Sequence, residues 1–518
     1  MEALRLSRID HNARCPFFGG CLRTSTVSLS RIALLFLVII VGKSHAGAND
    51  YFAGLSKVGG AELPQYLLIL AAGIAIFSFV IVLAKPTIGI MLAMLLFPFV
   101  TEDAEMTITK LLASVVTFGF FVAWLASKIA LYSAHRGERD YLGCERALML
   151  FLVYLGINGI YAKMAGISPV DIIRDLVSLS NLLLFLIIKR FVRSTEGVTL
   201  LERFQFVLMV IFGLELTLIT AAHASMVIRF LPISMSALQI LGLFITCMVG
   251  LICFNGSRPL LMVTGAIPTI YLVTTSNRTQ FIAAILGIGF VMLVTKATRA
   301  KIAFSFFVIV ILLTGLILAE KYRPASFESK LAKLQRIQDA GSDLAIEDRI
   351  GEAKQCFGLF QSSPFLGKGA GYTYHLSRKY VQGMGTNVVL DTNFTHSDLM
   401  FMLSKFGIIG VVLFFWFYFK ISKLSWLVWK NASSARVRAK GLICFLILIS
   451  AFLMCQSTPF LQSRIDAFFL SLVMGYAYCL YRFNIAGQES EPVYENEPVI
   501  RLTPAPVYSR LYSENRGA

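Results

Sequence analysis

The chain has 518 residues, of which 57% are hydrophobic and only 15% charged, and it carries a formal net charge of +17. Soluble domains are about 45–50% apolar and about 25% charged, so this composition excludes a soluble protein. The apolar residues fall in uncharged runs of about 15–22 residues, enough to cross a hydrocarbon core of about 30 Å, and the polar/apolar alternation of a transmembrane barrel is missing from the sequence. We therefore predict an all-α polytopic integral membrane protein.

The predicted N-terminal segment covers residues 1–65 and contains a first hydrophobic stretch at residues 32–42, followed by an outer loop. The stretch follows Arg23 and Arg31 and precedes a Ser-His-Ala sequence. It is therefore either a first transmembrane span or the core of a signal peptide. Both alternatives leave the C-terminus on the same side of the membrane.

Long apolar runs predict transmembrane helices throughout residues 66–319 and again in residues 399–481. With the first stretch they give 13–14 spans. The predicted spans lie near residues 66–84, 87–100, 107–126, 147–162, 170–188, 204–222, 233–254, 259–275, 279–294, 302–319, 399–419, 441–455 and 466–481.

Basic residues gather in alternate connections between these spans, whereas the other short connections are poor in them and one, residues 102–105, is acidic. By the positive-inside rule, the basic connections and the C-terminus are cytoplasmic. The basic residues are spread over many short loops, so we do not expect a nucleic-acid partner. The basic connections carry Lys128, Arg136, Arg139 and Arg146, then Lys189, Arg190, Arg193 and Arg203, then Lys296, Arg299 and Lys301, and finally Lys420, Lys423, Lys430, Arg436, Arg438 and Lys440.

One connection, residues 320–398, is far longer than the others and is predicted to form a large periplasmic loop. Apolar residues recur at helical spacing over 327–337 and again over 346–360, which predicts two amphipathic helices. They either rest on the outer membrane surface or roof the helix bundle. The tail, residues 482–518, is rich in glutamate and proline and is predicted to be disordered and cytoplasmic.

Two outer-face residues stand out as candidates for chemistry. Arg278 lies in a very short outer turn between two apolar runs, where a guanidinium fork can bind diphosphate oxygens or, alternatively, snorkel to lipid phosphates. His396 lies where the long loop re-enters the membrane, and a histidine there can accept a proton from a sugar hydroxyl if Asp398 or a backbone carbonyl holds its tautomer. The alternative is a structural histidine.

Other residues leave a second function class open. Glu215 lies well inside a predicted span and Lys110 near the end of another, and a carboxylate in a span is typical of a proton-coupled transporter.

The glycines Gly407 and Gly410 let another helix approach their span closely. The cysteine and histidine spacing shows no metal-binding pattern, and we expect neither a metal nor another cofactor.

Together these motifs resemble the O-antigen ligase and O-antigen polymerase superfamily. The resemblance rests on the large late loop, on Arg278 opening a span, and on a histidine motif of His396 and Ser397, nine residues, Gly407, two residues and Gly410. Residues 349–353 and 363–369 also resemble the family's loop segment before that motif, so the likeness covers roughly residues 259–419. One departure is the bulkier stretch that follows the arginine, Thr279-Gln280-Phe281.

The resemblance implies a metal-independent glycosyltransferase of the bacterial cell inner membrane. Such an enzyme transfers a glycan from undecaprenyl diphosphate to an acceptor sugar hydroxyl on the periplasmic face, with no nucleotide sugar. By that likeness His396 is catalytic, Arg278 and Arg349 bind the diphosphate, and Ser397, Asp398, Gly407 and Gly410 support the site. The implied partners are the undecaprenyl-diphosphate-linked glycan donor, a glycan or lipid A-core acceptor, membrane lipids and other polysaccharide export proteins.

Several alternatives stay open at this point. Surface polysaccharide or exopolysaccharide polymerisation is favoured over ligation to lipid A-core in lipopolysaccharide biosynthesis, because no sequence feature identifies a lipid A-binding surface. A protein O-oligosaccharyltransferase would use the same chemistry. From another class, a secondary transporter or a lipid-linked glycan flippase would use Glu215 as its coupling carboxylate. Arg229 and Arg323 remain substitutes for Arg278 as the diphosphate contact.

Overall fold

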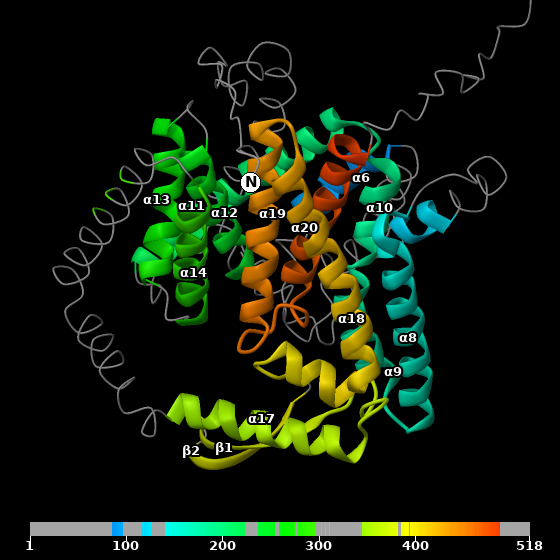
Figure 1. Cartoon of the computed structure of the whole chain (residues 1–518). Coiled ribbons are helices and arrows are strands. Elements are labelled where there is room, and N and C mark those ends of the chain that lie inside the picture. The colour runs from blue at the N-terminus through cyan, green and yellow to red at the C-terminus, as the bar shows by residue number, and fades with distance from the viewer. Residues whose placement is uncertain are drawn as a thin grey trace, which may run out of the picture.

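Helices make up most of the chain described by the computed structural model, which covers residues 85–96, 117, 119–125, 140–222, 237–253, 258–274, 278–295, 302, 306, 310, 344–381, 385–392 and 394–486. Figure 1 shows most of the helices running side by side as a bundle, with one helix and a two-stranded sheet across one end. The elements are α6 (Pro86–Leu96), η2 (Tyr141–Gly143), α8 (Cys144–Met164), α9 (Pro169–Ser180), α10 (Leu183–Phe191), α11 (Thr195–Ala222), α12 (Ala237–Cys253), α13 (Arg258–Thr274), α14 (Arg278–Val294), α17 (Leu344–Ser362), β1 (Tyr374–Val381), β2 (Gly385–Thr392), α18 (Asp398–Asn431), α19 (Ala435–Met454) and α20 (Arg464–Asn484).

Four stretches of helix in the described part of the chain are long and apolar enough to cross a membrane. They are Tyr141–Met164, Thr195–Leu214, Asp398–Asn431 and Ala435–Met454, and shorter apolar helices accompany them. The predicted class, an all-α polytopic membrane protein, is confirmed. The full predicted number of spans includes runs, such as residues 66–84, that lie outside the described residues.

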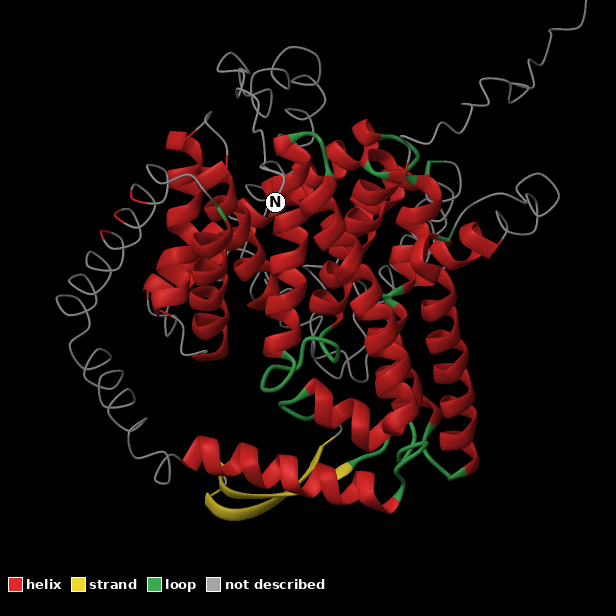
Figure 2. Ribbon diagram, in the orientation of Figure 1, coloured by secondary structure: helices red, strands yellow, loops and turns green. Residues whose placement is uncertain are grey.

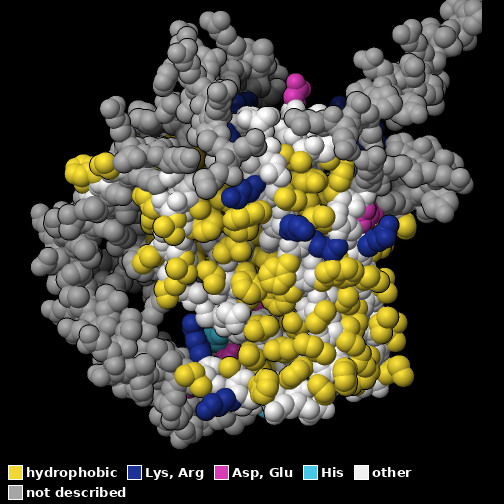
Figure 3. All heavy atoms as spheres, in the orientation of Figure 1, with side chains coloured by type: hydrophobic (Ala, Val, Ile, Leu, Met, Phe, Trp, Pro, Cys, Tyr) yellow, Lys and Arg dark blue, Asp and Glu magenta, His cyan; other side chains and the backbone are white. Residues whose placement is uncertain are grey.

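The outer surface of the bundle is apolar in the way that contact with lipid requires. On α8, the exposed side chains Leu150, Val153, Ile157, Ile160 and Met164 follow one another at intervals of three and four residues, so they form one stripe. Figure 3 shows a broad hydrophobic band on the described face, with basic side chains on two levels that the band separates. A surface of this kind is stable in hydrocarbon and not in water.

Two of the predicted spans contain a break in the structure. The first, near residues 170–188, divides at Asn181 into α9 and α10, and the Asn181 side chain donates to the backbone oxygen of Arg464 over 3.1 Å. This hydrogen bond joins the break between α9 and α10 to the first residue of α20. The second break is at Gly407 inside α18, where φ is 63° and ψ is −171°.

The end of the bundle that carries α17, β1 and β2 is called the loop face here (Figure 2). The predicted helix over residues 346–360 is confirmed as α17, and the predicted helix over 327–337 lies outside the described residues. The antiparallel pair of β1 and β2 was not predicted. A lone two-stranded sheet is marginally stable by itself and gives little sequence signal, but β1 packs on α17.

The helix α18 begins on the loop face and turns into the bundle at its break (Figure 1). Ser397 caps the helix by accepting a hydrogen bond from the Met400 backbone N–H over 3.3 Å. The helix α18 packs against α8, α19 and α20. The break therefore separates a first section, residues 398–406, from the section that crosses the bundle.

Gly407 can be tested directly, because its backbone lies in a region that only glycine adopts readily. A Cβ there would lie 2.3 Å from the backbone oxygen of Phe365 and 2.5 Å from its carbon. We expect Gly407→Ala to lower the free energy of unfolding by about 3 kcal/mol or more, from backbone strain and overpacking. The thermal midpoint in detergent measures the effect. Gly156→Ala in α8, where a Cβ meets nothing within 4 Å, is the control, and equal midpoints for the two variants would contradict the expectation.

Candidate active site

The segment just before α18 holds His396 in place through its neighbours. The Gln462 side chain accepts from the Thr395 backbone N–H over 3.1 Å and donates to the Thr395 backbone oxygen over 2.9 Å. The Ser397 hydroxyl donates to the backbone oxygen of Cys455 over 3.3 Å. The connection between α19 and α20, residues 455–463, thus fixes the backbone on both sides of His396.

His396 is joined to a buried carboxylate on α17. Its Nδ1 lies 2.9 Å from Oε2 of Glu352, and its backbone N–H donates to Oε1 of the same carboxylate over 2.5 Å. The Glu352 side chain is 5% exposed, whereas that of His396 is 34% exposed. A carboxylate at Nδ1 fixes the imidazole tautomer and orientation and stabilises the imidazolium.

Glu352 was not predicted to have a role, although its stretch was part of the family resemblance. The predicted apolar stripe of α17 includes Ile350 and Phe357, but these are exposed, at 51% and 45%, while Glu352 and Cys356 are buried. Apolar periodicity thus identified the helix but not the side that faces the protein. The sequence did contain a signal for Glu352: it follows Arg349, a predicted site residue, by one helical turn, so the two lie on neighbouring parts of the helix surface.

Asp398 does not hold the histidine tautomer, contrary to the prediction that it or a backbone carbonyl does so. Its carboxylate instead accepts from the Leu461 backbone N–H over 2.8 Å and from the Gln462 side chain over 3.2 Å. Asp398 therefore ties the start of α18 to residues 455–463. Its contacts, like the cap formed by Ser397, position the segment that carries His396.

The predicted diphosphate contacts lie on elements near this segment. Arg278 is the first residue of α14, and the next residue, Thr279, has its hydroxyl 2.6 Å from the Ser457 hydroxyl. Residues 455–463 therefore contact both the start of α14 and the segment of His396. The side chain of Arg278 lies outside the described part, as do Arg229 and Arg323. Arg349 is exposed on α17, one turn before Glu352.

The predicted motif glycines have different surroundings. At Gly407, the loop Pro364–Gly371 packs against the helix break, and the Ile408 backbone N–H donates to the Pro364 oxygen over 2.8 Å. At Gly410, a Cβ would lie 3.1 Å from the ring of Tyr154 on α8. Close approach of another helix, the role predicted for both glycines, is thus found at Gly410, while Gly407 forms the break.

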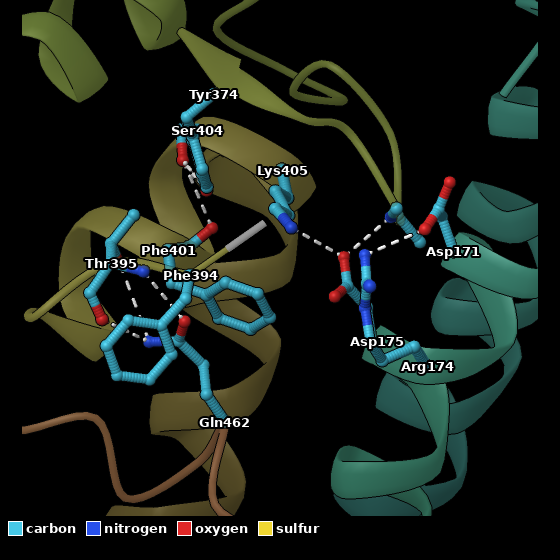
Figure 4. A network of polar contacts seen from close by, with 12 residues as sticks. Asp171, Arg174, Asp175, Tyr374, Phe394, Thr395, Phe401, Ser404, Lys405 and Gln462 are labelled. Carbon is cyan, nitrogen blue, oxygen red and sulfur yellow. Dashed lines mark hydrogen bonds and ion pairs between the residues drawn. The ribbon is translucent and has the colours of Figure 1, made fainter. Parts of the chain in front are cut away.

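A buried ion pair that was not predicted lies next to the break (Figure 4). The Lys405 Nζ is 2.7 Å from Oδ2 of Asp175 on α9, with the two side chains 0% and 6% exposed. The same carboxylate oxygen accepts from the Gly371 backbone N–H over 2.6 Å. The ring of Tyr374 lies 4.9 Å from Lys405 Nζ, and its hydroxyl is 2.7 Å from the Ser404 hydroxyl. These contacts join the loop, α9 and α18.

Asn158 on α8 bridges the same elements. Its side chain donates to the Leu366 backbone oxygen over 2.8 Å and accepts from the Ala370 backbone N–H over 2.8 Å. Neither Lys405, Asp175 nor Asn158 was identified in the sequence as part of a network. Their pairing depends on contacts between residues more than 190 apart in the chain, which the local sequence does not indicate.

The thiol of Cys356, one helical turn after Glu352 on α17, is buried. Burial, helped by the neighbouring Glu352 carboxylate, raises the pKa of Cys356 to about 12, so the thiolate is scarce at neutral pH. Among the described residues, no group of three or more His, Cys, Asp or Glu side chains is arranged to hold a metal ion. The His396–Glu352 pair, with a partly exposed imidazole and a buried carboxylate, is suited to proton transfer.

Residues 260–415 match the family model described as O-antigen ligase. The matched range contains every residue that was predicted for the site, from Arg278 to Gly410, and also Glu352 and Lys405. The predicted resemblance is confirmed. None of the curated proteins matches the chain.

Proposed function

We propose that the chain is a membrane glycosyltransferase of the O-antigen ligase and polymerase type, which moves a lipid-linked glycan to an acceptor, because residues 260–415 match the O-antigen ligase model. The proposed donor is a glycan on undecaprenyl diphosphate and the proposed acceptor is a sugar hydroxyl. The reaction takes place on the periplasmic face of the bacterial inner membrane.

The observation that carries the proposal is the His396–Glu352 pair on the loop face. A partly exposed imidazole with a buried carboxylate at Nδ1 is suited to general-base catalysis. In the proposed reaction Nε2 takes the proton of the acceptor hydroxyl, and the hydroxyl oxygen bonds to the anomeric carbon. The bond from that carbon to the diphosphate oxygen breaks, and its electron pair leaves with undecaprenyl diphosphate. Attack opposite the leaving group inverts the anomeric centre.

Negative charge develops on the diphosphate as this bond breaks, and arginine side chains supply the complementary charge. Fixed guanidinium groups that bind the leaving group more strongly in the transition state accelerate the reaction. We assign this role to Arg278 and Arg349. The contact of Thr279 with Ser457 supports the assignment for Arg278, because residues 455–463 also hold the His396 segment.

The arrangement of basic residues supports the proposed orientation. Lys189 pairs with Glu145, and Lys440 pairs with Glu202, at the end of the bundle opposite the loop face. Both lysines belong to connections that the positive-inside rule assigns to the cytoplasm. The loop face would then be periplasmic, where a lipid-linked donor is available and nucleotide sugars are not.

Within this chemistry we favour polymerisation of a surface polysaccharide, with ligation to lipid A-core next. Both reactions share the donor site, and they differ in the acceptor. A transporter or flippase using Glu215 is the alternative from another class. The His396–Glu352 pair argues against it, since a carrier has no use for a proton-transfer pair confined to one face.

The test follows the release of undecaprenyl diphosphate by purified protein in lipid, with an undecaprenyl-diphosphate-linked glycan and a candidate acceptor. We expect acceptor-dependent release by the wild type and a fall in kcat/KM of about 10²–10³ for Arg278→Ala and Arg349→Ala, as for the loss of one charge-stabilising donor. Arg146→Ala, exposed on α8 near the opposite end of the bundle, is the matched control.

A different pattern would reverse the assignment. Movement of the glycan across the bilayer without release, abolished by Glu215→Gln and unaffected by His396→Ala, would identify a carrier. Release that survives both arginine substitutions would leave the enzyme class intact but assign the diphosphate to other residues.

A further inference from the structure

Phe394 lies beside His396 and is an exposed residue. The Phe394 side chain is 40% exposed, and its ring centroid is 5.6 Å from that of His396 at an interplanar angle of 78°. In a near-perpendicular pair, the edge of one ring meets the face of the other. At least one face of Phe394 is therefore not covered by the imidazole.

Hydrogen bonds hold the backbone of Phe394 in place, and its ring packs against that of His396. Its N–H donates to the Thr392 hydroxyl over 3.1 Å, and the next residue, Thr395, is bound on both sides by Gln462 (Figure 4). A preorganised group loses little conformational entropy when a ligand binds it. The position of Phe394 thus favours ligand contact.

The surroundings of the ring indicate the kind of ligand. A sugar ring has apolar faces of C–H groups and an edge of hydroxyl groups. An aromatic ring face can pack against the C–H groups, and a neighbouring acid or base can exchange a proton with the hydroxyl groups. Phe394 and His396 present this combination within one ring pair, with the Glu352 carboxylate behind the imidazole.

We propose that Phe394 is the stacking surface for the acceptor sugar, holding it so that its hydroxyl meets Nε2 of His396. The proposal rests on the proposed glycosyl transfer and names a binding residue within it. It assigns Phe394 to the acceptor and not to the lipid-linked donor, whose diphosphate is assigned to arginines. In this position Phe394 would hold the acceptor for the transfer of its hydroxyl proton to Nε2 of His396.

Steady-state kinetics with each substrate varied in turn test this assignment. For Phe394→Ala we expect the KM for the acceptor to rise about tenfold or more, with the donor KM and the kcat at saturating acceptor within about threefold of wild type, because a stacking contact of about 1.4 kcal/mol corresponds to tenfold. Phe394→Trp, which keeps an aromatic face, restores the acceptor KM. Phe357→Ala, on the exposed side of α17, is the matched control and leaves all three values unchanged.

A binding measurement gives a readout that does not depend on turnover. The probe is the oligosaccharide released by mild acid from the lipid-linked donor, which keeps the non-reducing end that a polymerase would extend. Saturation-transfer NMR should show transfer from the protein to the sugar C–H protons for wild type and Phe394→Trp, and lose it for Phe394→Ala. Phe394→Leu tests for unfolding, since it keeps apolar bulk and should keep the wild-type thermal midpoint while losing the transfer.

The outcomes separate this inference from the function that it rests on. If the wild type shows no acceptor-dependent release, the proposed function fails. If transfer requires His396 while Phe394→Ala keeps the wild-type acceptor KM, the function stands and the stacking assignment is overturned. A rise in the donor KM alone would also overturn it, because the ring would then contact the lipid carrier.

Discussion

Replacing His396 by alanine is expected to lower kcat for glycosyl transfer by about 10²–10⁴, the usual contribution of a positioned general base. The substrate KM values should change little, because the imidazole acts on a proton that moves only in the transition state. The measurement is the acceptor-dependent release of undecaprenyl diphosphate at saturating donor and acceptor. Folding of the variant is checked by its thermal midpoint.

The same experiment tests whether Glu352 acts through the histidine. Glu352→Gln keeps an oxygen for the His396 backbone N–H but removes the negative charge at Nδ1, so we expect kcat to fall about 10–100-fold. The double variant should be no slower than His396→Ala alone, because groups that work as a unit are not additive. Additive losses would show that Glu352 has a separate role.

A second histidine provides the control. His375 on β1 also pairs with a carboxylate, Asp391, at 2.6 Å, but both side chains are about two thirds exposed, at 66% and 67%. The pair has the same chemistry in a setting open to water. His375→Ala should therefore retain wild-type kcat, and a loss equal to that of His396→Ala would contradict the choice of His396.

Much of the fold follows from the sequence, because apolar runs in lipid must form helices to satisfy their backbone hydrogen bonds. The helix over residues 346–360 was found by periodicity and is α17. The side of α17 that faces the protein was not predicted correctly, because in a membrane protein an apolar stripe can face lipid as readily as protein. Ile350 and Phe357 are accordingly exposed, and the buried side holds Glu352.

In the site, as in the fold, features marked by neighbouring residues in the sequence were predicted, and contacts between distant residues were not. His396 was found because a histidine at a membrane boundary, followed by a Gly-x-x-Gly pattern, is a local signal. Glu352 was missed because it lies 44 residues away, and only the fold brings the two together. The break at Gly407 was missed because the φ of a glycine is not determined by its neighbours in sequence.

The buried ion pair of Lys405 and Asp175 provides the prediction with the largest expected effect on stability. Removing one partner leaves an uncompensated charge in an apolar interior, which costs about 3–5 kcal/mol. We expect Lys405→Met and Asp175→Asn each to lower the free energy of unfolding by about this amount. The double variant should recover most of the loss, since no unpaired charge remains and the asparagine oxygen can still accept from Gly371.

The neighbouring pair on α9 is the matched control. Arg174 and Asp171 lie 2.8 Å apart, but their side chains are 41% and 31% exposed. Exposed pairs contribute about 0–1 kcal/mol, because water screens them. Arg174→Ala should leave the thermal midpoint almost unchanged. Equal effects of Arg174→Ala and Lys405→Met would show that burial of the pair does not matter.

The part of the protein that is destabilised by Lys405→Met can be measured as well as the size of the destabilisation. Lys405 lies two residues before the break in α18, and its pairing holds the Gly371 loop and α9 against the section that follows His396. Losing the pair should therefore loosen the loop face before the rest of the bundle. The thiol of Cys356, at 0% exposure on α17, reports this opening, because alkylation requires it to become accessible. We expect faster alkylation of Cys356, followed by mass spectrometry, in Lys405→Met and the wild-type rate in Arg174→Ala. If Lys405→Met lowers the thermal midpoint without exposing Cys356, then the ion pair stabilises the bundle as a whole and does not position the segment of His396.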